Sequence, residues 1–183
     1  MAEKKRLNTV LSLKIRYVVG LSAIALLVSS SFFAMHKVIS DQRDFSTIIY
    51  LAGEQAGLTN RIAYFASLMA TTDDESEFLM AKAQVGRTIH KIKSIHHILR
   101  KGDPENGIPL VESENLAIIY DDPMVGLEKA LYSFLERSAT VYDSNMEELH
   151  TNSAAYLFLT TYGPHVLEPL QNAAVEEYSR IGR

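Results

Sequence analysis

The most regular hydrophobic pattern of the chain begins in residues 48–63 and continues to residue 70. Large side chains recur there at alternating spacings of three and four residues, which is typical of one face of a helix in a bundle. A second stripe, of small side chains, runs beside the first and lets another backbone come close. The large stripe is Ile48, Leu51, Gln55, Leu58, Ile62, Phe65 and Met69, and the small stripe is Ala52, Ala56, Thr59, Ala63, Ala66 and Ala70.

Gln55 is the only polar member of the large stripe. A buried polar side chain costs stability unless it is hydrogen-bonded. Two interpretations stay open: Gln55 binds a ligand, or it fixes the register of the bundle, as single polar residues do in coiled coils. Gly53 and Gly57 also have two interpretations, close packing of a neighbouring helix or space for a ligand, and the spacing favours close packing.

Residues 17–35 form a run of 19 residues without a charge. A helix of that length spans roughly 28 Å, about the thickness of a bilayer core. A cleaved signal peptide is the alternative, but the apolar run is longer than a usual signal core and no clear Ala-x-Ala site follows it. We therefore predict a transmembrane helix. Residues 1–16 are basic, so the positive-inside bias places them in the cytoplasm and residues 36–183 outside the inner membrane, in the periplasm of a Gram-negative cell.

The rest of the chain predicts four antiparallel helices. The first continues from the membrane to residue 70. The second covers residues 74–101, with a capping box of Thr72 and Glu75 and a C-terminal cap at Gly102. Its seam is Phe78, Ala81, Val85, Thr88, Ile92, Ile95 and Leu99.

Residues 102–121 are predicted to be irregular, and the apolar run 116–120 is either strand-like or a single helical turn. Asp122 and Pro123 are typical of the start of the third helix. A fourth helical region, capped by Thr151 or Asn152, is expected to be kinked near residue 163 by Gly163 and Pro164. The predicted fold class is thus all-α: an N-terminal transmembrane helix followed by an antiparallel four-helix bundle. The buried face of the third helix is expected to hold Met124, Leu127, Leu131, Phe134, Val141 and Leu149.

Composition removes several classes of function. The chain has no cysteine, so thiolate chemistry and disulfides are excluded. The net charge is −4 overall, and residues 37–183 carry the acidic excess, so nucleic acid is an unexpected partner. No phosphate-binding glycine loop or hydrolase motif is present, and we expect no catalytic residues and no cofactor. His90, His96 and His97 are interpreted as a solvated basic face rather than a metal site, because no carboxylate on the same helix completes a ligand set.

Residues 49–63 resemble the motif that marks the first periplasmic helix of PilJ-type sensor domains, with a variant in nitrate/nitrite sensor kinases of the NarX type. The order of elements around the motif is also similar to that family. The resemblance implies an all-helical homodimeric receptor domain of a chemoreceptor, histidine kinase or cyclic-di-nucleotide enzyme. The matching positions are Ile49, Leu51, Ala52, Gly53, Gln55, Leu58, Arg61, Ile62 and Ala63, with Thr59 and Asn60 as conservative replacements.

The resemblance also implies a ligand site at the dimeric first-helix interface, which maps here onto Ala52, Gln55, Ala56, Thr59 and Arg61. In nitrate-binding members an arginine on this helix clamps the anion, as guanidinium groups suit planar oxyanions. Ala56 stands at that position here, so nitrate is not the expected ligand. Three possibilities remain for the ligand site that the resemblance implies: it binds another small anion, it binds an uncharged molecule, or it no longer binds a small molecule. Arg61 is interpreted either as an anion ligand or, preferably, as an ion-pair partner within the bundle.

The sequence thus predicts the extracytoplasmic sensor part of a longer membrane receptor, with a second membrane span following residue 183. A membrane-tethered helical module that binds another protein, without a small-molecule pocket, is the alternative. A stand-alone enzyme is the weakest hypothesis, because no constellation of residues supports it.

Overall fold

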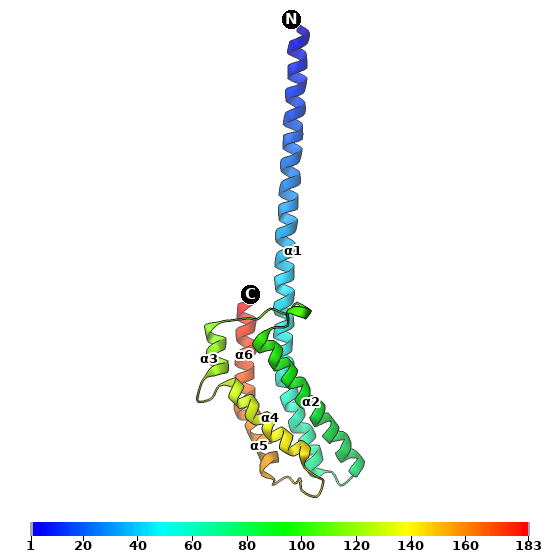
Figure 1. Cartoon of the computed structure of the whole chain (residues 1–183), viewed down its shortest axis with the longest axis vertical. Helices are drawn as coiled ribbons and strands as arrows, with labels where there is room; N and C mark the ends of the chain where they lie inside the picture. Colours follow the sequence, from blue (N-terminus) through cyan, green and yellow to red (C-terminus); the bar gives the residue numbers. More distant parts are fainter. Residues whose placement is uncertain (1, 183) are drawn as a thin grey trace. The chain divides into compact units, whose positions relative to one another are not determined.

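The computed structural model describes the backbone of residues 2–182 and the side chains of Lys14, of residues 16–37 and of residues 45–182. Within this part the chain is helical and has no β-strand, only an isolated bridge between Asp103 and Ile108 (Figure 1). The side chains of the basic residues 4–6, on which the predicted cytoplasmic segment depends, lie outside the described residues. The elements are α1 (Ala2–Thr71), α2 (Glu75–Lys101), the 3₁₀ turn η1 (Pro104–Asn106), α3 (Glu114–Asp121), α4 (Leu127–Asp143), α5 (Ala154–Tyr162), the π-helical segment η2 (Gly163–Leu167) and α6 (Glu168–Ile181).

Helix α1 belongs to two compact units, residues 1–43 and residues 44–183. In the first unit, the stretch Arg16–Lys37 is long and apolar enough to cross a membrane, and none of it is buried against other parts of the chain. Its leucine, valine and phenylalanine side chains are well over half exposed. An exposed surface of this kind is stable in lipid rather than in water.

The boundaries of α2 follow from capping chemistry. Asp74, rather than the predicted Thr72, is the N-cap: its carboxylate accepts hydrogen bonds from the backbone N–H groups of Ser76 and Glu77 at 2.7 and 3.2 Å. The capping box of Thr72 and Glu75 is therefore wrong, and Thr72 instead donates to Glu77. At the other end Gly102 has φ +73°, which a side chain disfavours, and its N–H closes the last turn on Ile98.

The predicted start of the third helix is also wrong. Asp122 accepts hydrogen bonds from the N–H groups of Met124 and Val125, which closes a separate turn, and α4 begins at Leu127 after the N-cap Gly126. A Cβ on Gly126 would lie 2.5 Å from the backbone oxygen of Tyr120, so only glycine fits between α3 and α4. Met124 lies in this turn and is 83% exposed, contrary to the prediction that it is buried.

The fourth helical region consists of three joined segments. Ser153 is the N-cap of α5, rather than Thr151 or Asn152. The break expected near residue 163 is the π-helical segment η2, which holds Pro164 and leads directly into α6. Insertions of this kind are typical of a helix that must shift its buried face. The apolar run 116–120 lies within α3, so it is helical rather than strand-like, and at eight residues the helix is longer than the single turn predicted; the expectation that residues 102–121 are irregular throughout is therefore wrong.

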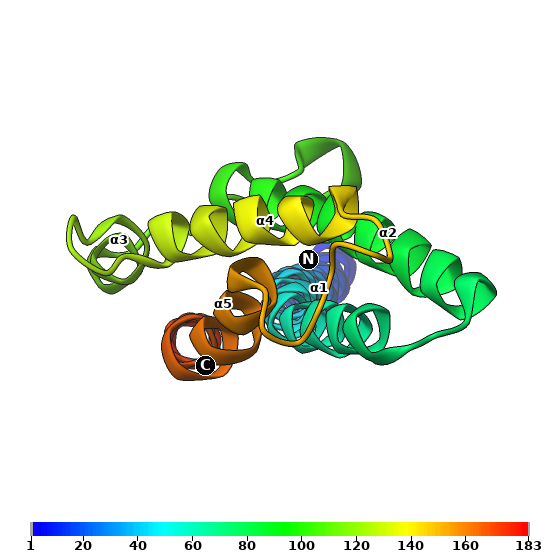
Figure 2. The same cartoon turned by 90° about the horizontal axis from the view of Figure 1, so that it is seen from below.

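Side-chain contacts define the order in which the long helices of residues 44–183 pack. Glu54 contacts Lys91 and Arg61 contacts Gln84, which joins α2 to the second half of α1. Helix α4 packs on α2, since Arg100 meets Glu128 and Gly86, in the N-terminal half of α2, lies next to the ring of Tyr142. Helix α6 packs on α1, through the hydrogen bond between Gln171 and Thr59, and on α3. In Figure 2, α2 and α4 lie on one side of the bundle, and α5 and α6 lie on the opposite side.

The core lies between these helices. Its largest fully buried side chains include Tyr120, Tyr178, Phe134, Ile62, Met69, Ile92, Leu127, Leu131, Leu159 and Leu167. All residues predicted for the seam of α2 are buried. The buried hydroxyls of Tyr178 and Tyr120 lie 3.4 Å apart, which joins α6 to α3.

Candidate functional site

A buried polar cluster joins α1 to α6. Gln55, Thr59 and Gln171 are each no more than 1% exposed. The Thr59 hydroxyl donates to the backbone oxygen of Gln55 at 3.2 Å and accepts from Nε2 of Gln171 at 3.0 Å. Because one hydroxyl serves as both donor and acceptor, it couples the side chain of α6 to the backbone of α1.

The cluster is not fully satisfied. Nε2 of Gln55 and Oε1 of Gln171 are buried and have no hydrogen-bond partner in the described part of the chain. A buried amide without a partner costs about 1–3 kcal/mol. One of these atoms is a donor and the other an acceptor, so a polar group that both accepts and donates would satisfy the pair. The cluster is therefore an incompletely hydrogen-bonded part of the α1–α6 contact.

The five residues predicted as a ligand site lie in three environments. Ala52, Gln55 and Thr59 face the interior of their own chain, and Ala56 is half-buried. Arg61 is exposed: it donates to Oε1 of Gln84 at 3.2 Å and lies over the ring of Phe65. The structure thus brings Gln55 and Thr59 together, adds Gln171, and places Arg61 on the surface.

Gly53 and Gly57 lie on the outer face of α1. A Cβ at either position would meet nothing within 4 Å in the described residues, so the close packing that the spacing favours is not made within the described part of this chain. The exposed residues Tyr50, Gly53, Gly57, Asn60 and Tyr64 recur at spacings of three and four. This outer stripe, as we name these five residues, has the period of a coiled-coil seam and is exposed in the described part of the chain.

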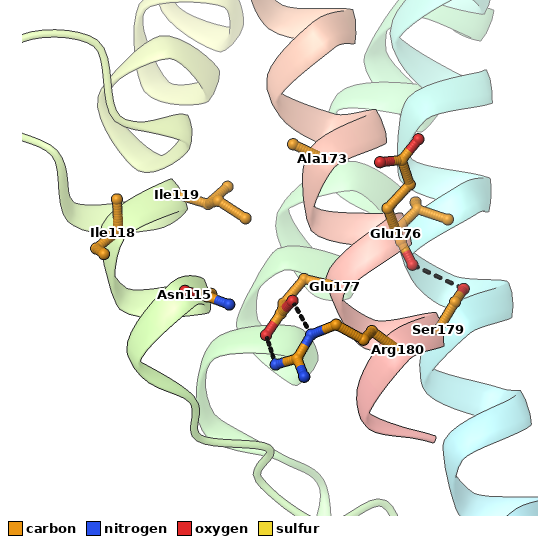
Figure 3. A pocket seen from close by; sticks show the side chains of 9 residues that line it. Asn115, Ile118, Ile119, Ala173, Glu176, Glu177, Ser179 and Arg180 are labelled. Atoms are coloured by element: carbon orange, nitrogen blue, oxygen red, sulfur yellow. Dashed lines mark hydrogen bonds and ion pairs between the residues drawn. The ribbon is translucent and has the colours of Figure 1, made fainter. Parts of the chain in front are cut away.

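A cavity of about 750 Å³ lies between α3 and α6 (Figure 3). Glu177 is its central group: Arg180 donates two hydrogen bonds to the carboxylate, at 2.6 and 2.7 Å, and Ser113 donates a third at 2.9 Å. The Arg180 hydrogen bonds are the main cause that lowers the pKa of Glu177 to about 2. Its hydrogen bond from Ser113 connects α6 to the start of α3. Because the Glu177 carboxylate already accepts three hydrogen bonds, few of its lone pairs remain for a ligand.

The three histidines of α2 do not share one environment. His90 and His97 are exposed, as a basic face requires, but His96 is only 6% exposed and both its ring nitrogens lack a partner in the described residues. The sequence contains a signal for this difference, because position 96 is four residues after Ile92 and three before Leu99, on the buried seam. No group of three or more His, Asp or Glu residues suited to a metal is found in the described part of the chain.

Comparisons of this chain with protein-family models, with curated proteins and with solved structures find no match.

Proposed function

We propose that this chain is the membrane-anchored extracytoplasmic sensor domain of a signal-transduction receptor, organised as an antiparallel four-helix bundle. One observation carries the proposal: α1 contains both the span-length apolar segment and the buried polar contact with α6. A change at that contact acts directly on a helix with a membrane-compatible segment.

The ends of the helices support this mechanism. A Cβ on Gly182 would lie 3.0 Å from Cβ of Phe45, so the end of α6 reaches the part of α1 that follows the apolar segment. Sliding or rotation of α6 against α1 would then be passed towards the membrane. A ligand or protein partner shifts such an equilibrium only by its difference in affinity for the two arrangements.

We further propose that the receptor is a homodimer through the outer stripe. Glycines at its centre let two backbones approach, and tyrosines at its ends supply large apolar contacts with a polar tip. Gly57→Leu should fold, because its side chain meets open space in the single chain, and should weaken the dimer. Ala83→Leu, on the exposed face of α2, is the matched control. Sedimentation of the full chain in detergent measures both, and an unchanged dimer in Gly57→Leu would place the interface elsewhere.

Membrane topology is tested directly because the chain has no native cysteine. Single-cysteine variants Asn8→Cys and Ser94→Cys are treated in intact cells with a membrane-impermeant maleimide. We expect labelling at position 94 only, with labelling at both positions after the cells are lysed. Labelling of position 8 in intact cells, or protection of position 94, would contradict the orientation.

Sensing itself is tested by titration calorimetry of the full chain in nanodiscs with nitrate, nitrite and a panel of metabolites. We expect a small molecule other than nitrate to bind. If no molecule binds and the dimer does not respond, the domain works as a membrane-tethered protein-interaction module instead, and capture of a specific periplasmic partner by the full chain is then the expected result.

A further inference from the structure

A second cavity, of about 380 Å³, lies between the C-terminal half of α2 and the beginning of α4. We name it the α2–α4 cavity. Its walls combine cationic side chains with aromatic and apolar ones. They are formed by Lys93, His96, His97, Arg100, Lys101, Glu128, Tyr132 and Leu135.

The charges of this cavity are only partly compensated. Arg100 is bound by two carboxylates, Asp121 at 2.6 Å and Glu128 at 2.9 Å. No ion pair to Lys93 or Lys101 is found among the described residues. Cations in the last turns of a helix are favoured by the helix dipole, so the lysines alone do not indicate a ligand.

The environment of His96 does indicate a ligand in this cavity. The His96 side chain is only 6% exposed and lines the cavity. Neither of its ring nitrogens has a hydrogen-bond partner in the described residues. A buried imidazole normally has both nitrogens hydrogen-bonded. Burial, its largest influence, lowers the pKa of His96, and the nearby carboxylate of Glu128 acts in the opposite direction.

The aromatic neighbours of His96 control access to it. The ring centroid of Tyr120, on α3, lies 6.0 Å from that of His96. The ring of Tyr132, on α4, is edge-on to the imidazole, with the two centroids 5.8 Å apart. Tyr120 is buried, whereas Tyr132 is 55% exposed. A turn of Tyr132 would uncover the imidazole to a molecule held in the cavity.

We propose that the α2–α4 cavity is a binding site for a small organic carboxylate, held by Lys93 and Lys101 and hydrogen-bonded by His96. The apolar walls of Tyr132 and Leu135 favour an organic anion over inorganic phosphate, which has no apolar part to bury. This site is separate from the α1–α6 cluster and does not depend on the proposed membrane topology or dimer.

The test uses benzoate as the probe, and benzamide as a neutral molecule of the same shape. Calorimetry of the purified full chain in nanodiscs should give saturable one-to-one binding of benzoate, at least about tenfold weaker binding of benzamide, and weaker binding of inorganic phosphate. Equal binding of benzoate and benzamide, stronger binding of phosphate, or no binding of benzoate would each overturn the proposal. Because binding is measured on the protein itself, a failure here leaves the sensor topology and dimer tests unaffected.

Variants separate the role of His96 from a structural one. His96→Leu removes two unpartnered nitrogens and should fold, yet bind benzoate about tenfold more weakly. His96→Gln, which keeps a donor and an acceptor, should recover part of the affinity. His90→Gln, on the exposed face of the same helix, should leave affinity unchanged. Equal affinity in wild type and His96→Leu would exclude His96 from the site.

The pH dependence adds a readout that folding alone does not change. A bound carboxylate next to His96 favours its protonated form, so benzoate should bind more tightly as pH falls from 8 to 6, by about threefold or more. The titratable and charged groups around His96 are Lys93, His97, Arg100 and Lys101 from α2, Tyr120 from α3, and Glu128 and Tyr132 from α4. His97→Gln should retain the pH dependence and His96→Gln should lose it. The opposite result would assign proton uptake to His97 and contradict the proposed role of His96.

Discussion

Replacing Gln55 by leucine should stabilise the protein. Gln55 is 1% exposed, and its Nε2 atom has no hydrogen-bond partner in the described residues. Leucine has a similar size, continues the hydrophobic stripe of α1, and leaves the backbone oxygen that Thr59 uses untouched. The substitution therefore removes an unsatisfied donor without removing the contact between α1 and α6.

The size of the effect follows from the cost of the buried amide. A net gain of about 1–2 kcal/mol in the free energy of unfolding is expected. The compact unit of residues 44–183 has about 140 residues. Its entropy of unfolding is therefore about 0.3 kcal/mol per kelvin. The melting temperature should therefore rise by about 3–7 °C.

Thermal unfolding of the full chain in nanodiscs, followed by far-UV circular dichroism, measures this change. The matched control is Gln84→Leu, a half-buried position on α2 whose amide accepts only a long surface hydrogen bond from Arg61, and its melting temperature should change by less than about 2 °C. A lower melting temperature for Gln55→Leu than for wild type would refute the reasoning. It would mean that the Gln55 amide is hydrogen-bonded in the folded protein, for which a bound polar molecule or a partner chain would be responsible.

Three further predictions concern packing and charge. Gly126→Ala should destabilise the protein by about 1–3 kcal/mol in urea unfolding, since its Cβ meets backbone oxygens at 2.5 and 2.6 Å, whereas Gly53→Ala, measured on the monomer, should stabilise the helix by up to about 1 kcal/mol. An equal effect of the two glycine variants would contradict the packing described here. Phe134→Ala should cost about 3–5 kcal/mol because the ring is completely buried, and a loss below about 1 kcal/mol would mean that the core is open there. Glu177→Gln should flatten the acid side of a stability–pH curve: with a folded pKa of about 2 against an ordinary 4.5, the contribution of Glu177 is complete above pH 4.5 and lost as pH falls towards 2. An unchanged acid limb in this variant would contradict the Glu177–Arg180 contact.

Periodicity predicted the helices well where one face is uniformly apolar. The seam of α2 and the positions Leu127, Leu131 and Phe134 of α4 are buried as expected, because alternating spacings of three and four permit only one inward face. Boundaries were predicted less well. Asp74 and Asp122 both stand before helical segments, but only the first caps a long helix, and the difference depends on the contact of Gly126 with the end of α3.

The candidate sites were only partly predictable. Gln55 was identified because it interrupts a hydrophobic stripe, but Gln171, which donates to the neighbouring Thr59, lies 112 positions after Thr59, and no local pattern connects the two. His96 was grouped with its exposed neighbours by residue type, although its spacing from Ile92 and Leu99 places it on the seam. The helical spacing, rather than the residue type, therefore distinguishes the buried His96 from the exposed His97.

The π-helical segment has a consequence for the phase of the last helix. Leu159, Gly163, Leu167 and Gln171 are all buried although they recur every four residues. In a regular α-helix each such step would rotate the side chain by about 40° beyond a full turn, so Gln171 would be carried well away from the direction of Leu159. The wider turn of Gly163–Leu167 absorbs part of that rotation. An uninterrupted α-helix through the same twelve residues would turn the amide of Gln171 about 120° away from the direction of Leu159, so the π-helical segment keeps Gln171 directed towards Thr59 on α1.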